Sequence, residues 1–391
     1  MAARVAGLLA AGLAGALALA GPAWAHGADA PDGTDYRTVV TSVTPALPGL
    51  TVRVVESGAR LELTNHTGRA IEVLGYRNEP YLQVGPDGVY QNLNSPATYL
   101  NRTLDGETQP PADADPTLPP RWQRVATEPV VRWHDQRTRW LAEQLPPEVR
   151  ADPRRPHRIR EWTVPLRDNV TPGRIGGTLD WVPPPAPVGW WLGTALGVLV
   201  VVAAGLLAGR FATVALAAFG AAGGATAIAL ATGRQLDAGA DGLAGALAGL
   251  PTGQTWPLLT GLAAVAAGAY ALARRPAADF VLTLGGGCLA LFAGIANASF
   301  FARSVPPVPW SGGWARFAVA VVLATGAGLA LVGMLLMRAA GRAATEAPVT
   351  GPAATEASAT GPSPAKPDRG APTAGQAPAG SRGATELGSK P

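Results

Sequence analysis

The chain has 391 residues and a formal net charge of +4 at pH 7, and almost all of its basic residues are arginines. These arginines are scattered rather than grouped on one face with interleaved aromatic residues, so the sequence excludes a nucleic-acid ligand. The single cysteine, Cys288, lies in an apolar run, which excludes a disulfide framework and a Cys-based zinc site within one chain.

The N-terminus has the three parts of a secretory signal peptide. Arg4 supplies a positive charge, residues 5–20 are apolar, and Ala-Trp-Ala at 23–25 forms a small-x-small cleavage site. The apolar stretch is shorter than the ~20 residues that a membrane-spanning helix needs. We therefore expect residues 1–25 to be removed during export, which makes His26 the first mature residue.

Residues 26–186 are expected to form an extracytoplasmic domain of short β-strands. Apolar and polar residues alternate on both sides of a turn at Ser57-Gly58, and Pro86 to Gly88 form a second turn between two β-type runs. A third hairpin is expected to join 161–169 to 176–183. This spacing is typical of an immunoglobulin-like antiparallel β-sandwich.

Two parts of this domain do not alternate in this way. The segment 103–120 is rich in Pro and Asp and is expected to be an exposed loop. The following segment, 126–145, is expected to be irregular or to contain a short helix.

Residues 187–338 form the predicted transmembrane domain. Five apolar stretches are each about long enough to cross the ~30 Å hydrocarbon core as a helix. They cover residues 189–209, 211–232, 256–273, 280–301 and 317–337, with tryptophans near several ends. The fold class is thus an all-β ectodomain followed by about five transmembrane helices.

The short loops give an orientation. If the β-domain lies outside the cell, the inner turns carry Arg210, Arg274, Arg275, Arg338 and Arg342, whereas the outer loops carry fewer arginines. The positive-inside rule therefore agrees with the signal peptide and predicts a multi-pass protein of the cell membrane. The stretch 236–250 is apolar enough for a short re-entrant segment, but Asp237 and Asp241 favour an outer loop.

The tail is compositionally different. Residues 339–391 consist mostly of Ala, Gly, Pro, Thr and Ser, with an imperfect repeat. Such a composition buries too little apolar surface to offset the entropy of ordering, which predicts a disordered cytoplasmic tail.

The sharpest chemical hypothesis concerns His26. An N-terminal histidine offers its α-amine and a ring nitrogen to one metal ion, and nitrogen ligands suit Cu(II). In this respect the predicted mature terminus resembles the histidine brace of periplasmic copper carriers and copper monooxygenases. The alternative is that His26 simply begins a flexible polar leader.

His134 and Asp135 are the candidate partners of His26. They stand in VVRWHDQRTRW, where Asp135 is able to orient a ligand histidine or to supply an oxygen. In the alternative interpretation, the neighbouring tryptophans pack on the sandwich and His134 belongs to a solvated rim.

Several runs of the β-domain, including the one that holds His134 and Asp135, resemble those of a known group of proteins. The runs GYRNEPYLQVGPDGVYQN, RWHDQRTRW and LDWVPPP resemble those of a group of actinobacterial membrane proteins that also have a multi-span C-terminal half. In that group the central motif often reads W-H-D-H-R-x-H-W. Here Gln136 and Arg139 replace two of its histidines, so only His134 and Asp135 match among the potential ligands. The resemblance implies an association with copper.

Other classes of function have weaker support. There is no nucleophile-elbow signature, and Gly285 to Gly287 fit a close helix contact better than a phosphate-binding loop. The spans contain few ionisable residues, which disfavours a transporter of small solutes or ions. The sequence therefore predicts a non-enzymatic membrane protein of the cell envelope with a copper-binding outer domain. The alternative is a metal-free sandwich that binds another envelope protein.

Overall fold

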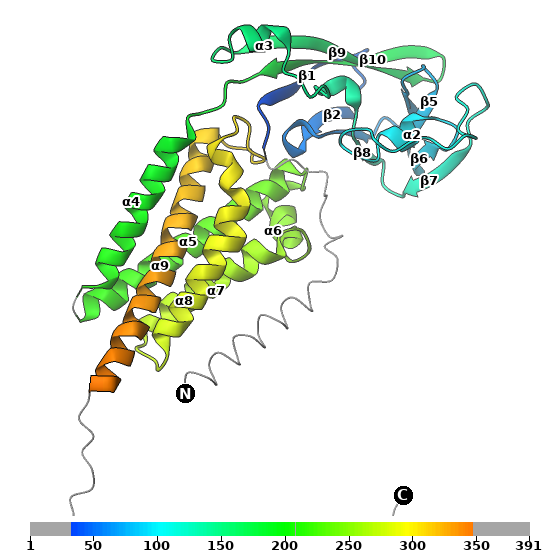
Figure 1. Cartoon of the computed structure of the whole chain (residues 1–391). Coiled ribbons are helices and arrows are strands. Elements are labelled where there is room, and N and C mark those ends of the chain that lie inside the picture. The colour runs from blue at the N-terminus through cyan, green and yellow to red at the C-terminus, as the bar shows by residue number, and fades with distance from the viewer. Residues whose placement is uncertain (1–32, 208, 347–391) are drawn as a thin grey trace, which may run out of the picture. The chain divides into compact units, whose positions relative to one another are not determined.

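The computed structural model describes residues 33–207 and 209–346 (Figure 1). The predicted signal peptide, His26 and the chain beyond Glu346 lie outside these residues, so the predictions made for them stay predictions.

The first half of the described chain is an antiparallel β region with two sheets. The larger sheet has the strand order β1-β10-β9-β4-β5-β6-β7, and the smaller has the order β2-β3-β8. The strands are β1 (Tyr36–Thr44), β2 (Leu50–Val55), β3 (Arg60–Asn65), β4 (Ile71–Leu74), β5 (Pro80–Gly85), β6 (Gly88–Asn92), β7 (Trp122–Ala126), β8 (Val130–Trp133), β9 (His157–Asp168) and β10 (Thr171–Trp181). Short helices α2 (Ala97–Leu100) and α3 (Pro147–Ala151) lie between strands. The predicted antiparallel sandwich is confirmed, with seven and three strands.

The core lies between the two sheets and follows the alternation of the sequence. Val52 pairs with Leu63 and Val54 with Leu61, so all four side chains share one face of the β2–β3 hairpin as predicted. They pack with apolar residues of the larger sheet, among them Val73, Val84, Val164, Ile175 and Leu179. Alternation therefore identified the buried face of both sheets.

The predicted turns are also present. Gly85 pairs with Gly88, which leaves Pro86 and Asp87 as a two-residue turn, and Gly88 adopts a positive φ of 115°. The β9–β10 hairpin closes between Asp168 and Thr171. The predicted loop 103–120 contains no helix or strand.

The segment 126–145, expected to be irregular or to contain a short helix, contains strand β8 and is otherwise irregular apart from one 3-10 turn, while β7 reaches it only at Ala126. Val130 to Trp133 pair with Leu61 to Thr64 of β3, and a single 3-10 turn, η2 (Gln136–Thr138), follows. Strand β7 has five residues and β8 has four, which is too short for an alternation of apolar and polar residues to be recognised. Their pairing with β3 and β6 decides their conformation.

Five helices are long and apolar enough to cross a membrane, as predicted. They are α4 (Pro187–Gly205), α5 (Arg210–Asp237), α7 (Thr255–Leu272), the combined segment Ala278–Phe301 and α9 (Gly312–Glu346). The combined segment begins as α8 (Ala278–Leu289) and continues as the π-helical turn η3 (Ala290–Gly294) and the 3-10 turn η4 (Ile295–Phe301).

Glycines bring these helices into close contact. A Cβ atom on Gly224 of α5 would lie 2.3 Å from the carbonyl oxygen of Gly261 of α7. One on Gly286 of α8 would lie 2.6 Å from the carbonyl oxygen of Gly326 of α9. The GGG run at 285–287 therefore provides a close helix contact, as predicted for small residues in membrane helices.

Two boundaries differ from those predicted. Residues 242–253 form a short helix, α6 (Gly242–Gly253), instead of a loop, and its 12 residues are too few to span a bilayer. Helix α9 continues to Glu346, so residues 339–346 are helical and not part of a disordered tail. Four of the eight residues in this extension are alanines, which favour the helix.

Candidate functional site

His134 follows strand β8 and is 2% exposed. Its Nδ1 lies 2.8 Å from the carbonyl oxygen of Ala59, and its Nε2 lies 3.2 Å from Nε of Arg60. A carbonyl only accepts and a guanidinium only donates, so Nδ1 carries the proton and Nε2 accepts. The ring is thus a neutral imidazole whose Nε2 lone pair, the one available to a metal, faces a guanidinium.

Asp135 has a different set of partners. Its carboxylate is completely buried and accepts hydrogen bonds from Nε1 of Trp133 at 3.0 Å and from the backbone N–H of Arg137 at 3.1 Å. The Arg137 side chain adds two further bonds, at 2.8 Å from Nε and 2.7 Å from NH2. Asp135 therefore caps η2 and holds a buried arginine.

Arg137 and two tyrosines complete this network. Burial lowers the pKa of Arg137 while Asp135 raises it, and the raising effect prevails. The guanidinium lies over the Tyr76 ring, 5.0 Å from its centroid, and the Tyr76 hydroxyl donates to Asn101. Burial, reinforced by Asp135, raises the pKa of Tyr76 well above its usual value, and burial does the same for Tyr81. This buried network stabilises the segment that follows the C-terminal end of β8.

The described residues contain no group of three or more His, Cys, Asp or Glu side chains placed to hold a metal. His134 and Asp135 are sequence neighbours, but they bond to different partners. Elsewhere in the same part of the chain, His66 is exposed and His157 Nε2 lies 2.6 Å from the carbonyl oxygen of Asp152. His26 lies outside the described residues, so the structure does not test the brace itself.

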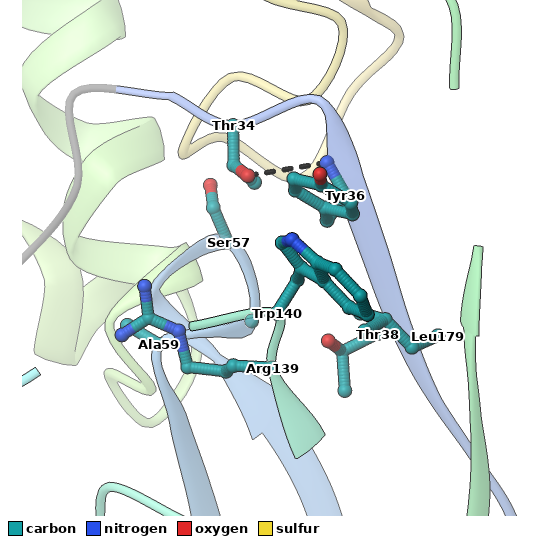
Figure 2. A pocket seen from close by; sticks show the side chains of 9 residues that line it. Thr34, Tyr36, Thr38, Ser57, Ala59, Arg139, Trp140 and Leu179 are labelled. Atoms are coloured by element: carbon teal, nitrogen blue, oxygen red, sulfur yellow. Dashed lines mark hydrogen bonds between the residues drawn. The ribbon is translucent and has the colours of Figure 1, made fainter. Parts of the chain in front are cut away.

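A small cavity lies beside this network. Figure 2 shows Ser57, Arg139 and Trp140 around it, and its volume is about 30 Å³. Ala59, whose carbonyl group accepts from His134, also lines it. The Ser57 hydroxyl is buried and has no hydrogen-bond partner within the described residues. The volume is enough for a water molecule and too small for an organic substrate.

Asp35 links the β region to the helical region, and we refer to its bonds as the Asp35 contact. Its buried carboxylate accepts from NH1 of Arg303 at 2.7 Å and from the backbone N–H of Ser304 at 2.9 Å. Thr34 and Val305 form a β-bridge beside it, and the Ser304 hydroxyl donates to the carbonyl oxygen of Val182 at 2.7 Å.

Glu62 forms a second link, the Glu62 contact. Its carboxylate is 5% exposed and accepts from Nε of Arg53 at 2.5 Å and from Nε of Arg132 at 2.6 Å. Both arginines also donate to the carbonyl oxygen of Gly239, at 3.0 Å and 2.7 Å, just beyond the end of α5. Nearby, the Asp237 carboxylate accepts from the backbone N–H of Ser57 at 2.8 Å.

The partners in these two contacts are far apart in sequence. Asp35 and Arg303 are separated by 268 positions, and Arg53 and Gly239 by 186. The sequence pattern favours an outer loop at Asp237 and indicates no role for Asp35 or Glu62. No local sequence pattern indicates these contacts, because Asp35, Glu62 and the arginines each look like ordinary surface charges in the sequence.

Comparison with models of known protein families, with curated proteins and with solved structures finds no match. The resemblance to the actinobacterial group therefore stays a prediction.

Proposed function

We propose that this chain is a non-enzymatic membrane protein of the cell envelope whose β region binds another envelope protein without a metal. The observation that carries the proposal is the pair of contacts made by Asp35 and Glu62. The Asp35 carboxylate accepts directly from Arg303 and Ser304, whereas Arg53 and Arg132, which pair with Glu62, donate to the carbonyl oxygen of Gly239. Asp35 is buried, so moving the β region away from the helix ends would leave its carboxylate without these partners, which favours one orientation of the β region.

The proposed topology puts the β region outside the cell. The β region contacts the connections at 237–239 and 303–305. With five spans, the connections at the other helix ends are 206–209 and 273–277, together with the end of α9. Arg210, Arg274, Arg275, Arg338 and Arg342 stand at or near these ends. Positive charges at this end support a cytoplasmic location for it.

Strand β7 supports a binding role for the β region. It is an edge strand of the larger sheet and pairs only with β6 within the described residues. Val125 on β7 is 49% exposed, and Leu118 in the preceding loop is 51% exposed. An open strand edge with exposed apolar side chains suits the addition of an extended segment from a partner protein.

The copper hypothesis receives no comparable support from His134 and Asp135. Both side chains already belong to internal hydrogen-bond networks. Copper binding therefore depends on His26 alone, and we treat it as the competing outcome of the experiment below.

A photo-crosslinking amino acid placed at position 125 tests the proposal in membranes of cells that express the chain. We expect one defined protein to be crosslinked, equally with and without a copper chelator. Glu161, which is on β9 with a side chain 83% exposed, is the control position and should not capture that protein. The Val125→Asp change should prevent its capture from a crosslinker placed at Arg124. Capture that requires copper would support the metal hypothesis instead.

A further inference from the structure

The outer face of the larger sheet has a polar groove of about 470 Å³ at the closed end of the β9–β10 hairpin. Arg69, Glu72, Gln83, Arg167, Asp168 and Asn169 line it together with Ala70. Its volume lies within the range of roughly 300–1,000 Å³ that is usual for small-ligand sites. None of these residues takes part in the network around His134.

Ion pairs fix the charged side chains of the groove. Nε and NH2 of Arg167 donate to Oε2 of Glu72 at 2.7 and 2.5 Å, and NH1 of Arg69 lies 2.7 Å from Oδ2 of Asp168. Two arginines and two carboxylates therefore cancel. An anion would have to compete with the carboxylates for the arginines, and a cation would have to compete with the arginines for the carboxylates. Charge compensation favours a neutral ligand.

Residues of the neighbouring strands continue the line of groove residues as a row across the sheet. Glu72 stands opposite Arg167 on one side and Gln83 on the other, Gln83 stands opposite Tyr90, and Tyr90 stands opposite Arg124. Directly opposed residues share a face, and the alternate positions Val73 and Val84 are buried in the core. The row therefore lies on the outer face of the sheet.

The chemistry of this row matches that of a sugar. Guanidinium, carboxylate and amide groups are planar, and each offers donors or acceptors in pairs to neighbouring hydroxyl groups. The half-exposed Tyr90 adds an aromatic face, whose negative potential attracts the weakly positive C–H groups of a sugar ring. Ion pairing holds Glu72 and Arg167 in position before a ligand arrives, which lowers the entropic cost of binding.

We propose that the outer face around Glu72, Gln83, Arg167 and Tyr90 binds a neutral, polyhydroxylated ligand, namely a segment of an oligo- or polysaccharide. This goes beyond the proposed protein partner, which would bind at the β7 edge. The two proposals can fail separately, because the crosslinking experiment reports on Val125 and the sugar site has its own variants.

The full chain in lipid nanodiscs is titrated with cellohexaose, maltohexaose and xylohexaose by calorimetry, because maltoside detergents would compete for the site. We expect at least one oligosaccharide to bind saturably. Its affinity should change less than about twofold between 50 and 300 mM NaCl, since screening acts on net charges and this groove is compensated. Sodium phosphate and calcium chloride should not bind there.

Gln83→Ala and Tyr90→Ala should each weaken the binding by about fivefold or more, in line with the loss of one hydrogen bond or one stacked ring. Gln144→Ala, at an exposed loop position, is the matched control and should bind as the native chain does. Thermal unfolding of each variant checks that the fold is retained. The absence of binding by all three sugars, or equal binding by Gln83→Ala and the native chain, would overturn the proposal.

Discussion

Nε of Arg60 donates a hydrogen bond to Nε2 of His134 at 3.2 Å, across 74 positions of the sequence. Arg60 also pairs through NH1 with Glu56, at 2.9 Å. The histidine therefore joins the end of β8 to the β2–β3 hairpin. This relationship gives His134 a structural role that does not require a bound metal.

Replacement of His134 by Ala should destabilise the β region by about 2 kcal/mol, because the Ala59 carbonyl and the Arg60 guanidinium each lose a buried partner. His66→Ala is the matched control. Its side chain is exposed, so the change should stay within about 0.5 kcal/mol. Chemical denaturation followed by tryptophan fluorescence compares the two variants. Equal effects would contradict the structural role.

The competing copper hypothesis makes its own prediction at His26. We expect copper titration of the processed chain to show no stoichiometric Cu(II) site, and insertion of one alanine ahead of His26 should change nothing. A brace requires the α-amine and the imidazole of the same terminal residue. Stoichiometric binding that disappears on insertion would establish the brace and refute a metal-free function.

Alkaline pH should destabilise the β region, and Tyr81 should contribute to this effect. Burial raises its pKa above the ordinary value of 10.0, so the unfolded chain loses the proton first. The stability is complete below pH ~10 and falls as the pH rises towards the pKa of the folded state. Denaturant titrations between pH 8 and pH 11 should therefore show a smaller loss for Tyr81→Phe than for the native chain. An unchanged loss would show that Tyr81 is not the cause.

The glycine pair 286 and 287 tests the packing of the helices. A Cβ atom on Gly286 would meet the backbone of α9, whereas one on Gly287 would have no heavy atom within 4 Å. Gly286→Ala should cost about 1–3 kcal/mol through overpacking. Gly287→Ala should be neutral or slightly stabilising, because alanine favours the helix. Unfolding in mixed micelles gives both values, and equal stabilities would contradict the described packing.

Regular periodicity made much of this fold predictable. Five long apolar stretches predict the membrane helices without knowledge of any partner. Alternation along each strand, as at Val52 and Val54, predicts the half-buried strands in the same way. Strands β7 and β8 and helix α6 are short, and their structure depends on neighbours that are distant in sequence.

The environment of the candidate site was less predictable than the fold. The motif around His134 has the residue types of a metal site, and nothing local shows that Ala59 and Arg60 engage the imidazole ring. In the same way, Asp35 and Glu62 look like ordinary surface charges until the fold brings the helix ends against them. Long-range pairing determines both features, and one sequence alone does not encode it in a recognisable pattern.

The central claim is that the β region is fixed to the helices, and a distance distribution tests it most directly. Spin labels are placed at Glu161→Cys on β9 and at Gly313→Cys, where a side chain meets no neighbour, after Cys288→Ala removes the natural thiol. Pulsed electron resonance in nanodiscs should give one narrow population, and this should broaden when Asp35→Ala is combined with Arg53→Ala, Glu62→Ala and Arg132→Ala, which together remove both contacts. A broad distribution in the chain that keeps Asp35 and Glu62 would contradict the account.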